Sequence, residues 1–187
     1  MSQAFEELAV DGLVALFGDA THGIAAQLRL IETALGLDEN AIPDPEGIAS
    51  AVLPADARSP LIQVYEEASE PLEAGHRHNF AEVDCTVGIS YNGDSDLEAS
   101  ERLMRRYVQA VRMSLKASPT CLGAVGQAYW TDANRSLDLT YDSLTRHGRA
   151  VGVRVRIQDQ EEPTSVHPQL WRRANRRDHR GSNLRHR

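Results

Sequence analysis

The amino-acid sequence predicts an α+β domain: a mostly antiparallel sheet of about four strands with helices packed on one face, plus an extended C-terminal tail. Residues 80–91 alternate apolar and polar side chains, as a half-buried strand does. Residues 97–115 repeat apolar side chains at helical spacing. The apolar faces consist of Ala81, Val83, Cys85, Val87, Ile89 and Tyr91 in the strand and Leu97, Met104, Tyr107, Val108, Val111 and Leu115 in the helix.

Two amphipathic helices are expected at the N-terminus, over residues 4–17 and 21–35. In the second, Ile24, Leu28, Ile31 and Leu35 form one apolar stripe. Asp19 or Thr21 is positioned to cap this helix, and Gly36 to end it.

Residues 38–59 read as a loop because four prolines lie in or next to this stretch. A short helical turn is expected within it, at 45–52, since proline is favourable at the first position of a helix. The first strand should cover 59–67, and residues 66–79 should connect it to the antiparallel strand 80–91.

Three extended segments are expected after the helix that ends at Ala117. These are residues 122–130, 136–141 and 149–158, of which the last alternates valine or isoleucine with polar residues or glycine. His147-Gly148 lies between the last two segments and is expected to form a hairpin turn.

The distribution of charge divides the chain into a domain at 1–162 and a basic extension at 163–187. The stretch 167–187 holds seven arginines and one aspartate, about +6, which leaves 13 Lys+Arg and 26 Asp+Glu, about −13, in the other 166 residues. No apolar run approaches the ~18 residues that span a bilayer, and no secretory signal is visible. We expect Cys85 to be a buried thiol and no disulfide to form.

The basic extension is the main binding candidate, through an aromatic side chain and five arginines. Docking on an acidic protein surface by bidentate Arg–carboxylate pairs is favoured, and a neighbouring copy offers such a surface. Contacts with nucleic-acid phosphates, weakened by salt, and an idle solvated tail are the alternatives. The residues concerned are Trp171, Arg172, Arg173, Arg176, Arg177 and Arg180.

Candidates for a metal site are weak. His76 and His78 would point the same way in an extended segment, with Asp84 nearby, but no third ligand has a recognisable spacing. Solvated loop histidines are the favoured interpretation, and no metal or cofactor is predicted. A run of carboxylates reads as a solvated face for the same reason, since it is local; it comprises Glu66, Glu67, Glu70 and Glu73.

Motifs of nucleophilic catalysis and of phosphate binding are missing. Cys121 has no evident base, and Gly123 and Gly126 read as a turn. Tyr129 and Trp130 are expected in the core or at a subunit contact. The sequence therefore predicts a protein that is not an enzyme.

The order of elements resembles the tail terminator (tail completion) proteins of long-tailed bacteriophages. The resemblance covers roughly residues 20–160, whereas the long early loop and the extension after Glu162 depart from the simplest members. It is carried by the helix that ends near Leu35, the strand 60–65, the strand 80–91 with the helix 98–112, and the closing β segments 136–141 and 150–157.

The resemblance implies a structural virion protein without catalytic activity. Such a protein forms a ring of six copies on the last ring of the tail tube. There it stops polymerisation and offers a docking face to the head-side connector or stopper protein. It would be assembled in the host cytoplasm and reside at the head-proximal end of the tail. Genomic DNA would pass through its lumen without specific binding, and acidic side chains lining that lumen would let it slide.

Three alternatives stay open. The chain could be another neck or tail joint protein (connector, stopper or tube protein), a small metal enzyme that uses His76 and His78, or a nucleic-acid-binding protein that uses the arginine extension. Metal analysis with chelator treatment tests the second, and a gel shift that compares the full chain with one ending at Glu162 tests the third.

Overall fold

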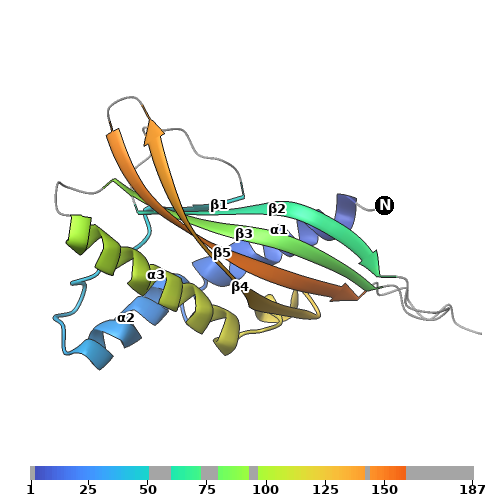
Figure 1. The fold of residues 1–187 in the computed structure, drawn as a ribbon. Coiled ribbons are helices and arrows are strands. Elements are labelled where there is room, and N and C mark those ends of the chain that lie inside the picture. The colour runs from blue at the N-terminus through green and yellow to red at the C-terminus, as the bar shows by residue number, and fades with distance from the viewer. Residues whose placement is uncertain (1–2, 51–59, 73–79, 93–96, 142–143, 159–187) are drawn as a thin grey trace, which may run out of the picture.

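The computed structural model describes residues 3–50, 60–72, 80–92, 97–141 and 144–158 (Figure 1). The predicted extension and its boundary at residue 162 lie outside this part. The described elements are α1 (Gln3–Gly18), α2 (Ile24–Leu35), β1 (Gly47–Ala49), β2 (Leu61–Leu72), β3 (Phe80–Asn92), α3 (Leu97–Ala117), the 3₁₀ turn η1 (Cys121–Gly123), β4 (Gln127–Tyr141) and β5 (Leu144–Gln158).

The five strands form one mixed sheet in the order β1-β2-β3-β5-β4. The β1–β2 pairing is parallel and the other three pairings are antiparallel. The predicted α+β class is confirmed, with five strands in place of about four. β3 is the central strand, and its predicted antiparallel pairing with β2 is present.

One face of the sheet is apolar because its strands alternate. On β3, Val83, Cys85 and Val87 are buried, while Glu82 and Asp84, which alternate with them, point to the other face and are half-buried. β5 continues the pattern, with its alternate valines opposite those of β3. The expectation that Cys85 is a buried thiol is confirmed.

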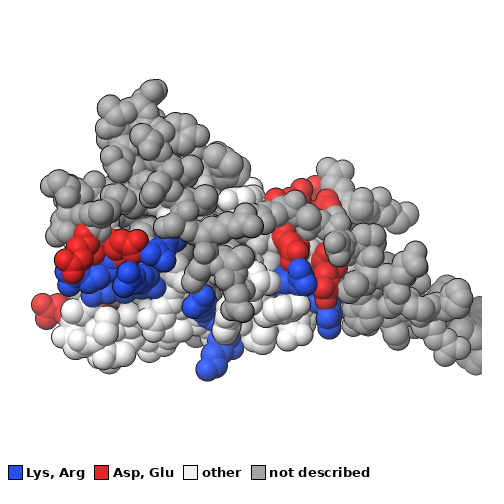
Figure 2. Space-filling view, in the orientation of Figure 1, with Lys and Arg blue, Asp and Glu red and all other residues white. Residues whose placement is uncertain are grey.

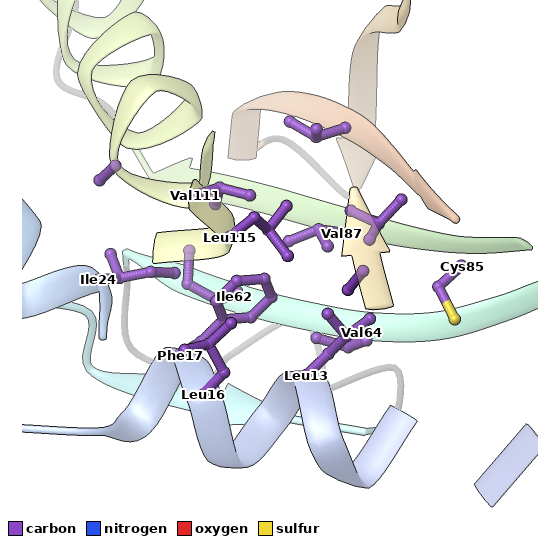
Figure 3. Close-up of a cluster of buried hydrophobic side chains, with 14 of the residues drawn as sticks. Leu13, Leu16, Phe17, Ile24, Ile62, Val64, Cys85, Val87, Val111 and Leu115 are labelled. Carbon is purple, nitrogen blue, oxygen red and sulfur yellow. The ribbon is translucent and has the colours of Figure 1, made fainter. Parts of the chain in front are cut away.

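Three helices cover this apolar face. α1 contacts β1, β2, β3 and β5, and α3 contacts β3, β5 and β4, with α2 packed against α3. Figure 3 shows Phe17 of α1 beside Ile62 and Leu13 of α1 beside Val64, with Leu115 of α3 close by. These side chains are buried in a single cluster. Each such side chain contributes about 1.5–3 kcal/mol on burial, so the cluster makes one rigid body of the sheet and its helices.

The junction between α1 and α2 differs from the predicted cap. Asp19 accepts hydrogen bonds through Oδ1 from the backbone N–H groups of Thr21, at 2.9 Å, and His22, at 2.7 Å, and these bonds hold its pKa below the ordinary value. α2 begins only at Ile24, after Gly23. A Cβ at Gly23 would lie 2.2 Å from the Asp19 carbonyl oxygen, so only glycine allows this close approach. Gly36 ends α2 in the left-handed conformation, as predicted.

The loop after α2 is fixed by a buried glutamate. Glu32 is 2% exposed and accepts hydrogen bonds from the backbone N–H groups of Ile42, at 2.6 Å, and Asn40, at 3.1 Å. Arg29 pairs with Glu32 at 2.9 Å and donates to the Ile42 carbonyl and to Asp44, both at 2.7 Å. A stretch with few apolar residues is thereby held in one conformation.

The helical turn predicted at 45–52 is wrong. Residues 47–49 are extended and form β1, whose Ile48 pairs with Ile62 and packs against the core. The Glu46 N–H donates to the Pro60 carbonyl at 2.8 Å and aligns the two segments. Pairing with β2 therefore decides the conformation, because the local preference for a helical turn is weak.

Two strands are longer than predicted. β2 continues to Leu72 through a bulge between Glu66 and Ala68, in a region expected to be a connection. The segments 122–130 and 136–141 were expected to be separate, but residues 127–141 form one strand with an irregularity between Trp130 and Asn134. A bulge inserts unpaired residues without ending the strand. It interrupts the alternation of apolar and polar residues, so the sequence pattern does not show that the strand continues.

The hairpin turn predicted at His147-Gly148 is also wrong. Both residues lie within β5, opposite Tyr91 and Ser90 of β3. Tyr141 pairs with Leu144, so the chain reverses between these two residues. The hairpin end of β4 and β5 rises away from the helices at the upper left of Figure 1.

The buried glutamate generates a testable prediction. Glu32→Gln removes the charge that faces Arg29 and weakens the bonds to the backbone of the loop, so the free energy of unfolding should fall by about 2 kcal/mol in urea denaturation. Glu98→Gln is the matched control, because Glu98 is 81% exposed and pairs with Arg102 one turn away; it should cost less than about 0.5 kcal/mol. Equal losses in the two variants would contradict the anchoring role of Glu32.

Candidate functional site

A basic stripe runs along α3. Its members are spaced alternately three and four residues apart, so they share one face of the helix; they are Arg102, Arg105, Gln109, Arg112 and Lys116. The helix as a whole carries five basic and two acidic residues. Figure 2 shows basic side chains gathered over α3, with acidic ones beside them toward one end. In a chain with a net charge of −7, this is a local reversal of sign.

A groove of about 340 Å³ opens beside this stripe, and β5 contributes to its wall. Val108 is 6% exposed and adds a small apolar area to the lining. The polar lining consists of Arg105, Gln109 and Arg112 from α3 and Arg149 from β5. We refer to this feature as the α3 groove.

Arg149 of β5 forms an ion pair with Glu101 of α3. Its Nη2 lies 2.9 Å and 2.6 Å from the two carboxylate oxygens of Glu101. Arg105 also approaches Glu101, at 3.4 Å. Glu101 therefore serves two arginines, while the described residues offer Arg112 no carboxylate partner at all. The α3 groove keeps a net positive charge.

Two guanidinium donors at the α3 groove are left without acceptors. The Nε atoms of Arg112 and Arg149 are shielded from solvent, and no described residue accepts a hydrogen bond from either. A buried unsatisfied donor costs roughly 1–3 kcal/mol. The groove therefore combines positive charge, an apolar surface and unused donors, which suits an anionic group such as a carboxylate or a phosphate.

The second group of charges lies on the face of the sheet away from the helices and is internally paired. Arg154 donates to both oxygens of Asp84, at 2.7 and 2.9 Å, and these bonds hold the pKa of Arg154 above its ordinary value. Arg156 pairs with Glu82 at 2.6 Å. These residues face one another across β3 and β5, so the charges stabilise strand pairing and leave little to bind a ligand.

Several residues singled out in the sequence lie outside the described part of the chain. They are the six of the extension, Trp171, Arg172, Arg173, Arg176, Arg177 and Arg180, together with His76, His78 and Glu73. Asp84, considered beside the two histidines, is engaged by Arg154. Within the ranges that the structure describes, no three His, Cys, Asp or Glu residues are grouped to hold a metal ion. No helix in these ranges has the length and apolarity to cross a membrane.

The remaining candidates are distributed over the core and the edge strand β4. Cys121 is fully buried, and burial raises the pKa of its thiol to about 12. Tyr129 is half-buried opposite Arg154. Trp130 is 37% exposed, so it is not a core residue, and a subunit contact is the part of the prediction that stays open.

A scan against known protein families found no match to this chain, and a search of curated proteins found none similar to it. Function therefore has to be inferred from the described surfaces. The α3 groove was missed in the sequence, although the spacing of basic residues within 102–116 signals it. Arg149 could not be assigned to it, because only the fold brings β5 beside α3.

Two arginines of the α3 groove should respond oppositely to loss of charge. Arg112→Met removes an unpaired buried donor and keeps the length of the side chain, so the free energy of unfolding should stay the same or rise by about 1 kcal/mol. Arg149→Met, the matched control, breaks the pair with Glu101 and should cost about 1–2 kcal/mol. Urea denaturation measures both; a loss for Arg112→Met as large as that for Arg149→Met would contradict the assignment.

The thiol of Cys121 should be inert in the folded protein. The thiolate is the reactive form, and a pKa of about 12 leaves almost none of it at pH 8. In a Cys85→Ala background, a disulfide reagent such as dithionitrobenzoate should react with less than one-tenth of the protein within minutes, and with all of it in urea. Rapid labelling without urea would show that Cys121 is accessible and more acidic than its burial implies.

Proposed function

We propose that this chain is a structural virion protein: a phage tail terminator that forms a ring of six copies on the end of the tail tube. The ring joins the tube to the head-side connector or stopper protein. The support is the resemblance in element order together with a described domain that is one rigid helix-backed sheet. We refer to this helix-backed sheet as the wedge. A subunit of a ring functions through its shape and its contact surfaces, and a rigid wedge can do so.

One observation carries the proposal furthest: the two flanks of the wedge differ in charge. α1, the helix that reaches the edge strand β1, holds three acidic residues and no basic one, whereas α3, the helix that reaches the opposite edge strand β4, holds five basic and two acidic residues. A ring built from heterologous contacts needs two different surfaces that fit each other. The same logic applies to the second candidate, another neck or tail joint protein (connector, stopper or tube protein).

The partners in this proposal are other copies of the chain, the tail tube protein and the connector or stopper. Genomic DNA passes through the lumen without specific binding. The arginines of the extension, Arg172 to Arg180, are proposed to dock on an acidic protein surface. No catalytic step, metal or cofactor is part of the proposal.

Electron microscopy of a virus that lacks this gene tests the proposal. Tail tubes should lack a defined length and heads should remain unjoined, because nothing would stop polymerisation or offer the docking face. Tagged protein supplied from a plasmid should restore infectious particles and be labelled at the head-proximal end of the tail. Label on the head shell, or tubes of normal length joined to heads in the mutant, would refute the terminator role. Label elsewhere in the neck would favour the second candidate.

A further inference from the structure

We infer that the exposed face of α1 of one copy docks in the α3 groove of the next copy. This inference rests on the proposed ring and adds to it the two surfaces that meet. It assigns the α3 groove a carboxylate-bearing protein partner, a second copy of this chain.

The exposed face of α1 has the composition that the α3 groove requires. Glu7 and Asp11 lie one helical turn apart and are both exposed. No described residue pairs with either of them. Leu8 beside them is 47% exposed, which is unusual for a leucine in a helix that packs on a core. The face thus presents an apolar side chain flanked by carboxylates.

The α3 groove is the complement of that face. Its apolar surface is Val108, and guanidinium groups of Arg105 and Arg112 lie on either side along the helix. A volume of about 340 Å³ accommodates a leucine side chain. Carboxylates of Glu7 and Asp11 could accept hydrogen bonds from the guanidinium groups, including the Nε donors that are unpaired in the isolated chain once the side chains turn toward them.

The two surfaces also have the placement that a head-to-tail contact needs. α1 reaches the edge strand β1 as well as β2, β3 and β5, and α3 reaches the opposite edge strand, β4, as well as β5 and β3. Each copy can therefore use α1 toward one neighbour and α3 toward the other, and such a contact closes when the rotation per copy fits a ring. A phosphate backbone would match the charge of the groove but would leave Leu8 of α1 uncovered, so a protein partner is favoured.

A charge exchange tests the inference by sedimentation of purified protein at low salt. Glu7→Arg with Asp11→Arg makes one variant, and Arg105→Glu with Arg112→Glu makes the other. Each alone brings like charges together and should self-associate at least about 100-fold more weakly than the unchanged chain. An equimolar mixture should regain association to within about tenfold, because every contact between alternating copies again joins opposite charges.

A matched control changes the same charge elsewhere. Asp38→Arg with Glu39→Arg alters two exposed acidic residues beyond α2 and should leave association unchanged. Arg105→Gln with Arg112→Gln replaces the reversal if that variant fails to fold, and should weaken association about tenfold.

The inference is overturned if the unchanged chain stays monomeric at high concentration in low salt, if the mixture stays dissociated, or if the control dissociates as well. Binding of duplex DNA that requires Arg105 and Arg112, without self-association, would also overturn it in favour of a nucleic-acid surface. Failure of the charge exchange in a chain that still caps tubes would leave the proposed function intact. A successful exchange in a chain found outside the neck would refute only the function.

Discussion

The structure depends on β3, because one face of this central strand is apolar and has to be buried away from solvent. Its buried valines and Cys85 can be covered only by helices, while Asp84 and Glu82 on the other side need polar partners. Both requirements are met by β5, which supplies valines to the first face and arginines to the second. The consequence is a two-layer domain with the three described helices on one side. Polarity across a single strand thus sets the architecture of the whole wedge.

Hydrogen bonds and ion pairs fix the loop after α2, which the hydrophobic core holds only in part. The loop after α2 has few apolar residues, yet Glu32 and Arg29 hold its backbone, and the hydroxyl of Tyr107 on α3 donates to the Pro43 carbonyl. That loop leads directly into β1, whose short pairing with β2 extends the sheet. Burial raises the pKa of Tyr107, so its hydroxyl remains a donor at any physiological pH. The edge of the sheet near α1 is therefore set by contacts made at α3.

Elements that depend on local periodicity were predicted correctly, whereas elements that depend on contacts between distant segments were not. β3, β5 and α3 each carry a full apolar face within one segment, so periodicity alone identifies them. β1 is three residues that are extended because they pair with β2, and β4 is continuous because a bulge absorbs its irregular part. The α3 groove needs Arg149, which belongs to β5 and reaches α3 only in the fold. Local pattern contains no trace of such long-range pairings.

The proposed contact between copies consists mainly of ion pairs, and this affects how the ring assembles. Ion pairs at an exposed surface contribute little each, and a single apolar contact between Leu8 and Val108 adds only part of a small interface. One such contact is weak, which keeps copies apart while they are dilute. In a closed ring, however, every copy is held at two surfaces, and the last contact forms within an assembly rather than between free molecules. Weak pairwise contacts of this kind would therefore add up to a stable closed ring. The unpaired guanidinium donors of the α3 groove would contribute to it, because they gain hydrogen-bond acceptors only when a second copy binds.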